Sequence, residues 1–307
     1  MSKGVLITGA TGQQGGAVVD SLIASPSSTS EFTLLAVTRN PDSPSAKRLS
    51  EKSSNIKVVK GDLNDVPGLF SAARAAHSNL WGVFSVQVPM GKGQSVESEE
   101  VQGKAMVDEA LRQGIKQFVY TSVDRGGAKS FDTPTDVPHF LSKHRIEHHL
   151  VEKATDTDMN YTILRPTAFM ENFAPGFFSK VFGAAWKLYI PDDKGMQLVS
   201  VQDVGHFAAQ AFRDPQNYRN RGISLAGDEP TFAQADGAFR SKAGVPMPET
   251  YGIFGRGLMW ASHDMERMMT FIGNEGYHAD IGALKKEHPG LMSLGEWIEK
   301  KSAWSKK

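Results

Sequence analysis

Short apolar runs alternate with longer mixed segments through the first half of the chain. The runs contain Val, Ile, Leu and Phe without polar alternation, which is typical of strands covered on both faces. The segments between them are long enough for crossover helices, so the pattern predicts a parallel sheet with helices on both sides. We therefore predict an α/β fold with a doubly wound sheet, whose strands lie at 4–8, 32–38, 56–60, 81–86, 117–122 and 161–164.

The pattern changes after the sixth run, and most of the remaining chain is predicted to be helical. Two further strands, at 197–201 and 223–226, flank a helix predicted from Asp203 to Phe212. Because these elements extend the sheet and the remainder does not, we predict two parts. A sheet domain covers 1–165 and is completed by 197–226, and a smaller, mostly helical C-terminal lobe is formed by 166–196 and 227–307.

Local signals add detail to this outline. Ser-rich polar stretches at 25–30 and 40–54 predict loops and surface turns. Ser293, with Glu296 three residues later, predicts a capping box at the start of the last helix. An apolar helical stripe in the C-terminal lobe favours core packing, with a substrate pocket or a partner surface as alternatives; it comprises Met259, Trp260, Met265, Met268, Met269 and Phe271.

Composition narrows the function classes. The 307 residues are 40% hydrophobic and 22% charged, as in ordinary soluble globular proteins. Lys+Arg and Asp+Glu are both 34, so the excess positive charge expected of a nucleic-acid binder is missing. Without cysteine, disulfides, thiolate nucleophiles and cysteine-ligated zinc are excluded. No apolar stretch is long enough for a signal peptide or a bilayer span, so we expect a cytoplasmic protein, or one also found in the nucleus, that binds neither membranes nor nucleic acid directly.

A glycine-rich turn at 9–16 follows the first predicted strand and opens a helix, which is the context of a dinucleotide-binding turn. Gly9 permits the tight turn, and Gly12 lets backbone N–H groups approach a diphosphate. Gly15 shares a helix face with apolar residues and allows close contact with the sheet. This predicts a nicotinamide dinucleotide on a Rossmann-type domain; the alternative is a tight turn without a ligand.

The end of the second strand distinguishes two cofactors. NAD-specific folds often carry an acid there for the ribose 2′-hydroxyl, but here the chain reads Thr38-Arg39-Asn40-Pro41. Arg39 can pair with a 2′-phosphate, which predicts NADP(H), with NAD(H) as the weaker alternative. The alternative is that Arg39 is a solvated surface residue without a ligand. After the third strand, Asp62 either accepts a bond from the adenine amine or caps the next helix.

Several motifs in order resemble the NmrA-like group of atypical short-chain dehydrogenases/reductases; they are 9–16, 38–41, 61–62, 101–104, 118–122, 137–140 with Lys143, 169–173 and 276–298. The resemblance implies an NAD(P)-binding Rossmann domain and a smaller C-terminal lobe that closes a cleft. With it, the predicted cofactor contacts are Gly9, Thr11, Gly12, Gln13, Gln14, Gly15, Arg39, Asn40, Asp62, Leu63, Val86, Gln87, Lys143, Thr167 and Phe169.

The predicted catalytic residues are Lys143, Ser122 and His139. Short-chain reductases usually combine a Tyr acid, a Lys four residues later and a Ser, and here His139 stands at the Tyr position. His139 and Lys143 share one helix face with two aliphatic residues, which directs Lys143 toward the cleft and the nicotinamide ribose. The alternative is that Lys143 extends to solvent. Three roles stay open for His139. It acts as the acid, or Lys143 supplies the proton instead, or His139 is only a packed helix residue.

The resemblance implies two kinds of protein. One is a redox-sensing regulator that binds the cofactor and a partner protein, with weak or no turnover. The other is an NADPH-dependent reductase of a small apolar carbonyl, enone or imine that uses Lys143 and Ser122. The missing Tyr favours the regulator. His144 and His148 have a spacing that can bind zinc, but no third ligand is evident, so we predict no metal site.

Overall fold

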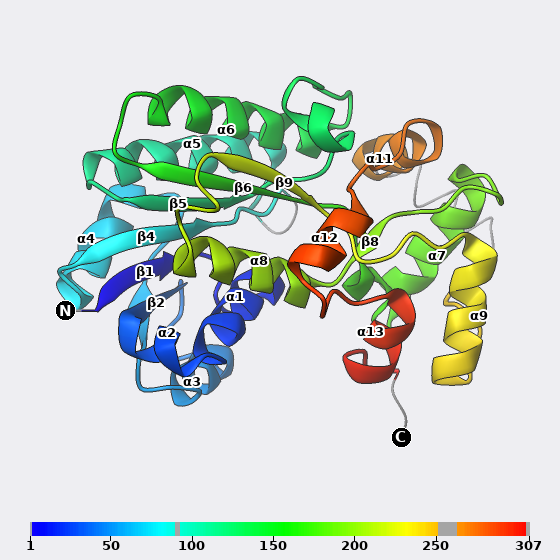
Figure 1. The fold of residues 1–307 in the computed structure, drawn as a ribbon, viewed down its shortest axis with the longest axis horizontal. Helices are drawn as coiled ribbons and strands as arrows, with labels where there is room; N and C mark the ends of the chain where they lie inside the picture. Colours follow the sequence, from blue (N-terminus) through cyan, green and yellow to red (C-terminus); the bar gives the residue numbers. More distant parts are fainter. Residues whose placement is uncertain (1, 90–92, 251–262, 305–307) are drawn as a thin grey trace. The chain divides into compact units, whose positions relative to one another are not determined.

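The computed structural model describes residues 2–89, 93–250 and 263–304. Its main sheet has seven strands in the order β3-β2-β1-β4-β5-β6-β9 (Figure 1). The pairings from β3 through β6 are parallel, which confirms the predicted α/β fold. The strands are β1 (Lys3–Ile7), β2 (Phe32–Thr38), β3 (Ile56–Lys60), β4 (Leu80–Ser85), β5 (Gln117–Thr121), β6 (Asn160–Pro166) and β9 (Arg221–Leu225).

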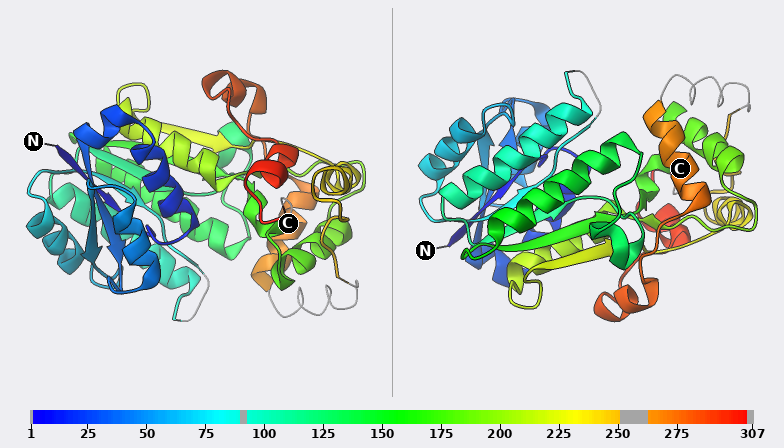
Figure 2. Two further views of the ribbon diagram at one scale, coloured as in Figure 1. Left: turned by 90° about the horizontal axis from the view of Figure 1, so that it is seen from below. Right: turned by 90° about the horizontal axis from the view of Figure 1, so that it is seen from above.

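The chain order reverses between β1 and β4, because β2 and β3 extend the sheet one way and β5 and β6 the other. In a doubly wound sheet, such a switch point opens a crevice at the carboxyl ends of the strands. Figure 2 shows one set of helices over each face of this sheet. One face carries α4 (Val66–Ala76), α5 (Val96–Arg112) and α6 (Pro138–Ala154), and the other carries α1 (Gln13–Ile23) and α8 (Val201–Arg213).

The first helix layer packs on the sheet through a continuous apolar core. Leu6, Val83 and Phe118 of the strands are fully buried against Phe70 of α4 and Met106 of α5. On the other face, α8 approaches α1 closely at Gly205, where a Cβ atom would lie 2.5 Å from the Ala17 backbone. Burial on both faces explains why the strands read as unbroken apolar runs.

The chain divides into two compact units. The first contains the residues up to Ser122, together with 142–164 and 204–223, and the second contains 123–141, 165–203 and the residues from 224 onward. The segment 123–141 had been predicted within the sheet domain. It belongs to the second unit because Val123, Val137 and Phe140 lie in that unit's apolar core.

The second unit is mostly helical. A small sheet pairs β7 (Ala168–Phe169) with β8 (Leu198–Val199). Trp186, Phe239 and Trp297 anchor its core. The helical elements are η1 (Gly127–Phe131), η2 (Met170–Phe173), α7 (Phe177–Tyr189), α9 (Phe232–Ala243), α11 (His263–Asn274), α12 (Ile281–Glu287) and α13 (Leu294–Lys300).

Two sequence predictions for the second unit are confirmed. Ser293 and Glu296 form the expected capping box at the start of α13. In the Met-rich stripe, Met269 and Phe271 are buried in the core, and Met265 and Met268 pack against it. Met259 and Trp260 lie outside the described residues.

The predicted loops at 25–30 and 40–54 were wrong, because each contains a short helix. These are α2 (Pro26–Glu31) and α3 (Pro44–Glu51). Both begin with proline, whose fixed φ suits the first helical position. In α3, the Ser43 hydroxyl also accepts a bond from the Ala46 amide at 3.3 Å. Ser43 is therefore a helix cap, whereas Ser25 precedes α2 without a side-chain cap bond.

The strand predicted at 197–201 was partly wrong. Only Leu198–Val199 is extended, and it pairs with β7 instead of joining the main sheet. The next helix begins at Val201, two residues earlier than predicted. The Glu171 carboxylate accepts a bond from the Val201 amide at 3.1 Å, which stabilises this earlier start.

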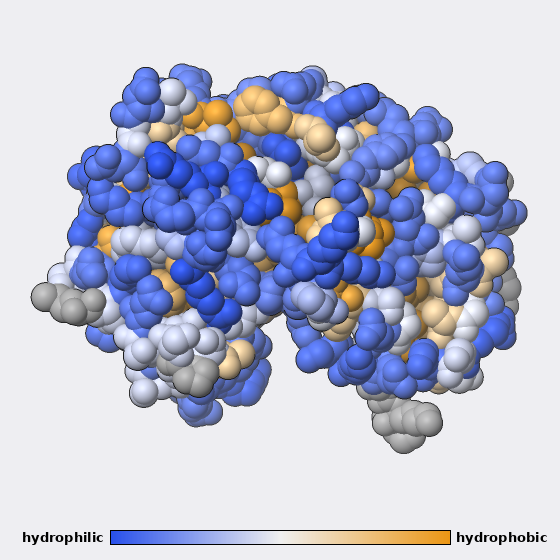
Figure 3. Space-filling view, in the orientation of Figure 1, coloured by the Kyte–Doolittle hydropathy of each residue, from blue (hydrophilic) through white to orange (hydrophobic). Residues whose placement is uncertain are grey.

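The surface seen in Figure 3 is largely hydrophilic, with hydrophobic residues in scattered patches. Among the described helices, none is both long enough and apolar enough to span a bilayer.

Candidate functional site

A tight glycine turn joins β1 to α1. Gly9 has a φ of 60°, a left-handed conformation that favours glycine, and a Cβ there would lie 2.7 Å from Val86 Cγ1. A Cβ on Gly15 would lie 2.4 Å from the Gly9 carbonyl oxygen. Gly15 therefore lets α1 pack directly on the turn that follows β1, whereas the sequence predicted this close contact with the sheet.

Gly12 closes the turn before α1. Its N–H donates to the Gly9 carbonyl at 2.8 Å, so this donor belongs to the turn. Gly12 is the N-cap of α1, which begins at Gln13. The first N–H groups of a helix have no intrahelical acceptor, and the helix dipole adds partial positive charge. The donors available to an anion are therefore those of Gln13, Gln14 and Gly15.

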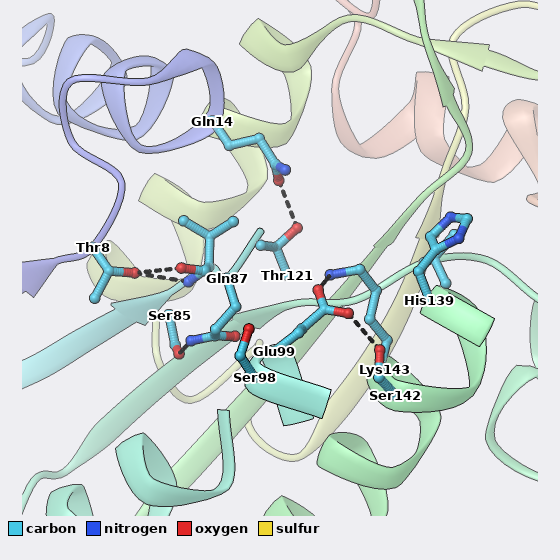
Figure 4. Close-up of polar contacts among 12 residues, drawn as sticks. Thr8, Gln14, Ser85, Gln87, Ser98, Glu99, Thr121, His139, Ser142 and Lys143 are labelled. Atoms are coloured by element: carbon cyan, nitrogen blue, oxygen red, sulfur yellow. Dashed lines mark hydrogen bonds and ion pairs between the residues drawn. The ribbon is translucent and has the colours of Figure 1, made fainter. Parts of the chain in front are cut away.

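Two side chains tie this turn to the neighbouring strand ends (Figure 4). The Thr8 hydroxyl accepts a bond from the Val86 amide at 2.8 Å and lies 3.1 Å from the Val86 carbonyl. The Gln14 side-chain carbonyl oxygen accepts a bond from the Thr121 hydroxyl at 2.6 Å. These bonds hold the carboxyl ends of β1, β4 and β5 in register at the start of α1.

A cavity of about 510 Å³ lies at the carboxyl ends of β1, β2 and β3. This volume is in the range of small-molecule and cofactor sites. Of the predicted cofactor contacts, its lining contains Gly9, Thr11, Arg39, Asn40, Asp62, Leu63 and Val86. The sequence did not predict the other lining residues, which are Thr8, Val37, Thr38, Gly61, Val88, Gln94 and Gln102.

Arg39 lies at the rim of this cavity with an exposed side chain. Within the described ranges it makes no hydrogen bond or ion pair. Its neighbour Asn40 is used locally, since the Asn40 side-chain carbonyl oxygen accepts a bond from the Asp42 amide at 3.0 Å. The acidic side chain in the lining is Asp62, which follows β3, and the residue directly after β2 is Arg39. The positive charge of Arg39 is therefore available to a ligand.

The cap alternative for Asp62 was wrong. Asp65 is the N-cap of α4, and its carboxylate accepts a bond from the Gly68 amide at 3.0 Å. Asp62 lines the cavity, and one of its oxygens accepts a bond from the Asn64 amide at 2.9 Å. This bond fixes the carboxylate while its second oxygen stays available to a donor.

Two predicted residues follow β4 and β5. Ser122 comes directly after β5 and is buried, and its amide donates to the Leu164 carbonyl at 2.7 Å. Gln87 is 2% exposed and donates from Nε2 to the Ser85 hydroxyl at 2.8 Å. Its Oε1 atom finds no hydrogen-bond donor in the part of the chain that the structure describes. A buried acceptor without a donor is costly and indicates a place for a ligand donor.

Lys143 does not extend to solvent. Its side chain is 12% exposed, and its ammonium lies 2.7 Å from Oε1 of Glu99, which is fully buried. The Ser142 hydroxyl donates to the other Glu99 oxygen (Figure 4). Sequence reasoning missed Glu99, although it precedes Gly103 by four residues and Met106 by seven on the buried face of α5.

His139 lies in the first turn of α6, and its Nδ1 atom lies 2.5 Å from the carboxylate of Asp264 on α11. The His139 amide also donates to Asp264, at 3.1 Å. Burial opposes ionisation of Asp264, but the hydrogen bond and charge of His139 outweigh it, so the pKa of this carboxyl lies below its ordinary value. The imidazole is therefore held by an anion.

A family model described as the NmrA-like family matches residues 1–290. The chain belongs to the NmrA-like family. This confirms the resemblance seen in the sequence. Curated relatives carry the same family description: the oxidoreductase FrzB of a Cladobotryum species is 29% identical over 198 residues, which cover 62% of this chain and 53% of FrzB. The oxidoreductase lnaB of Aspergillus flavus is 25% identical over 94% of this chain and 91% of lnaB.

This NmrA-like chain spans about half the length of the first two relatives, 53% of FrzB and 48% of ptmS from Penicillium ochrochloron. Solved structures share its fold at lower identity. The NADPH-dependent quinone oxidoreductase QOR2 of Escherichia coli, complexed with NADPH, is 22% identical with a TM-score of 0.70, and covers 96% of this chain and 98% of QOR2. NmrA, a negative transcriptional regulator in complex with NAD, is 16% identical with a TM-score of 0.69, and covers 98% and 95%.

In this NmrA-like protein, the remaining predicted contacts lie in the second unit. Thr167 is buried, and its hydroxyl donates to the Leu225 carbonyl at 3.1 Å. Phe169 is half-buried in β7. The ring centroids of His144 and His148 lie 4.3 Å apart. Among the described residues, no cluster of three side chains could hold a metal ion.

Proposed function

We propose that this chain binds NADP(H) in the cavity at the ends of β1, β2 and β3. The observation that carries the proposal is the combination, around one cavity, of the glycine turn and the available charge of Arg39. A helix N-terminus favours a diphosphate, and a guanidinium favours a phosphate monoester. The residues present therefore fit a dinucleotide with a 2′-phosphate.

Each part of the nucleotide has a counterpart in this chain. The amides of Gln13, Gln14 and Gly15 are proposed to hold the diphosphate, Arg39 the 2′-phosphate and Asp62 the adenine amine. NAD(H) is the weaker alternative, because the residue directly after β2, where NAD-specific folds often carry an acid for the ribose 2′-hydroxyl, is Arg39. Related structures support this range of cofactors, since QOR2 was solved with NADPH and NmrA with either NAD or NADP.

The nicotinamide half is proposed to lie toward β4 and β5, on the other side of β1 from Arg39. Three predicted residues occur along this part of the chain: Gln87 follows β4, Ser122 follows β5, and Lys143 is on α6. The Oε1 atom of Gln87 suits a carboxamide or hydroxyl donor, because it lacks one among the described residues.

We further propose that the chain is an NADPH-dependent oxidoreductase acting on a small apolar carbonyl, enone or imine. NADPH supplies a hydride when bound. Ser122 would donate a hydrogen bond to the acceptor atom of the substrate, and Lys143 would bond the nicotinamide ribose. His139, which stands at the position of the Tyr acid, is the proposed proton donor. The names of the curated relatives, which are oxidoreductases, support this proposal.

A second candidate is a redox-sensing regulator with weak or no turnover. It is favoured by His139 at the position where short-chain reductases carry a Tyr acid. An imidazole is shorter than a phenol, so a cofactor site can persist while proton transfer is lost. The printed description of NmrA as a negative transcriptional regulator is consistent with this alternative.

The test combines binding with turnover. NADPH and NADH are titrated against intrinsic tryptophan fluorescence, and NADPH oxidation is then followed with a panel of apolar carbonyls, enones and imines. We expect tight NADPH binding and steady oxidation that is lost in Lys143→Ala. Lys153→Ala is the control, because Lys153 is an exposed residue in the last turn of the same helix.

Two results would count against the proposal. Binding without turnover on any acceptor, together with a partner or oligomer change that depends on the redox state of the cofactor, would select the regulator. The absence of measurable affinity for either nucleotide would contradict both candidates.

A further inference from the structure

We propose that Glu99 is a positioning residue that fixes the Lys143 ammonium for the nicotinamide half of the cofactor. The inference rests on the proposed NADP(H) site and deepens it, because it names the side chain that prepares Lys143 before the ligand arrives.

The contact itself is specific. Both oxygens of the Glu99 carboxylate are used, one by the Lys143 ammonium at 2.7 Å and the other by the Ser142 hydroxyl. Figure 4 shows Lys143 and Ser142 directed at Glu99 from adjacent positions of α6. An ammonium has three N–H donors, so the bond to Glu99 leaves donors for a ligand.

Burial makes this contact more than a surface ion pair. Glu99 is fully buried, and Ser142 is 1% exposed. An ionised carboxylate in such a place is costly unless it is paired and hydrogen-bonded, so Glu99 and Lys143 depend on each other. The charge of Glu99 restricts a long and flexible lysine side chain that would otherwise sample many rotamers.

The other buried acid of α5 shows that such pairing can be purely local. Glu109 is 7% exposed and bonds Arg112 and Gln113, which lie three and four residues later in the chain. Glu99 instead reaches across to α6. The Glu109 carboxylate is therefore bonded by neighbours in sequence, whereas the Glu99 carboxylate positions a side chain of another helix.

The packing of the two helices sets the position of this contact. Gly103 lies one turn after Glu99 on α5, and Ile146 lies one turn after Ser142 on α6. A Cβ on Gly103 would be 2.4 Å from Ile146 Cδ1, so glycine allows a close approach of α5 and α6. The adjacent turn therefore holds Glu99 at a fixed distance from Lys143.

The test compares two ligands on three proteins. The dissociation constants of NADPH and of adenosine 2′,5′-bisphosphate, which lacks the nicotinamide ribose, are measured for wild type, Glu99→Gln and Glu109→Gln. We expect Glu99→Gln to weaken NADPH about tenfold, the loss of roughly one charge-assisted hydrogen bond, and to leave the bisphosphate within about twofold. Glu109→Gln is the matched control and should leave both constants unchanged.

A double-variant cycle checks that Glu99 acts through Lys143. In a Lys143→Met background, Glu99→Gln should have little further effect on NADPH binding, because the group it positions is gone. Lys143→Met leaves Glu99 without a countercharge, so it is the variant at risk of misfolding. If it misfolds, the charge-neutral Glu99→Gln/Lys143→Met protein is compared with Glu99→Gln alone, and equal NADPH constants are expected.

The inference would be overturned if Glu99→Gln weakened the binding of both ligands equally, or if its effect were no larger than that of Glu109→Gln. Full additivity of the two substitutions in the double-variant cycle would overturn it as well. A wild type that binds no NADPH would overturn the proposed function and this inference together. The two failures are therefore distinguishable.

Discussion

At the scale of single residues, Arg39 carries the choice between two cofactors. It stands where NAD-specific folds often place a carboxylate, and its charge is unused among the described residues. A 2′-phosphate would gain a cation at this position, whereas a 2′-hydroxyl would gain little. Discrimination is therefore expected to depend on this one side chain.

Replacing Arg39 with Glu reverses the charge at that rim. We expect the Kd for NADPH to rise about 100-fold through repulsion of the 2′-phosphate, with the Kd for NADH changed by less than about threefold. Fluorescence titration measures both. Arg48→Glu is the control, because Arg48 is exposed on α3 and outside the cavity lining. Unchanged discrimination in Arg39→Glu would contradict the assignment.

The pair of His139 and Asp264 predicts a pH effect on stability. The pKa of Asp264 is lowered in the folded state, so the unfolded chain binds more protons near the ordinary Asp value of ~3.9. The contribution of Asp264 is then present above about pH 4 and is lost as the pH falls through the lowered folded value. Asp264→Asn should cost more stability at pH 6 than at pH 3.

Urea unfolding of wild type and Asp264→Asn across that pH interval measures this difference. Asp192→Asn serves as the control, since Asp192 is exposed. A destabilisation of Asp264→Asn that is independent of pH would show that the carboxyl acts by shape or hydrogen bonding alone.

These residues also mark how far sequence reasoning reaches. Gly9 and Gly15 were predictable because their requirement is local: a left-handed turn and close contact within a few residues. Glu99 and Asp264 were not, because each acts on a partner from a distant segment, 44 and 125 residues away. An acidic residue amid polar neighbours normally indicates a solvated face, and only the fold brings these two inside.

At the scale of elements, the contact between α5 and α6 connects packing to chemistry. The helices approach at Gly103, and the turn beside it carries Glu99 and Lys143. The sequence predicted an inward face on α6, but neither the buried face of α5 nor the contact between the two helices. The short helices α2 and α3 were missed for a different reason, because proline and serine are common in both loops and helix starts.

Gly103→Ala tests this contact. The added methyl meets buried Ile146, so we expect a loss of about 1–2 kcal/mol in the free energy of unfolding, although alanine has the higher helix propensity. Removing the Ile146 Cδ1 methyl in Gly103→Ala/Ile146→Val should recover part of it. Urea unfolding gives all three values.

Gly237→Ala on α9 is the matched control, because nothing lies within 4 Å of its Cβ position. This variant should be neutral or more stable by up to about 1 kcal/mol. Similar losses at Gly103 and Gly237 would show that backbone effects, and not helix contact, explain the result.

At the scale of the whole molecule, each unit is assembled from separated stretches of chain. The chain passes from one unit to the other after residues 122, 141, 164, 203 and 223. Neither unit is therefore a contiguous sequence, and we expect the two to unfold together. The sequence predicted two parts, but not that 123–141 belongs to the second one, because that assignment depends on tertiary burial.

Cooperative unfolding has a measurable signature. Trp81 lies in the first unit, whereas Trp186, Trp297 and Trp304 lie in the second. Tryptophan fluorescence therefore reports mainly on the second unit, while NADPH is proposed to bind the first. NADPH at about 100 times its Kd should stabilise the protein by about 2.7 kcal/mol and raise the urea midpoint seen by fluorescence. A fluorescence midpoint that ignores NADPH while circular dichroism responds would indicate independent units.

The close contact of α8 with α1 has a consequence for biosynthesis. Gly205 belongs to a stretch made long after the glycine turn, so a nascent chain displays the outer face of α1 uncovered until translation passes residue 223. Until that moment the part of the sheet that α8 covers, where Phe212 packs on Gly82 of β4, stays exposed. We therefore expect the nascent chain to be prone to aggregation during this interval on the ribosome.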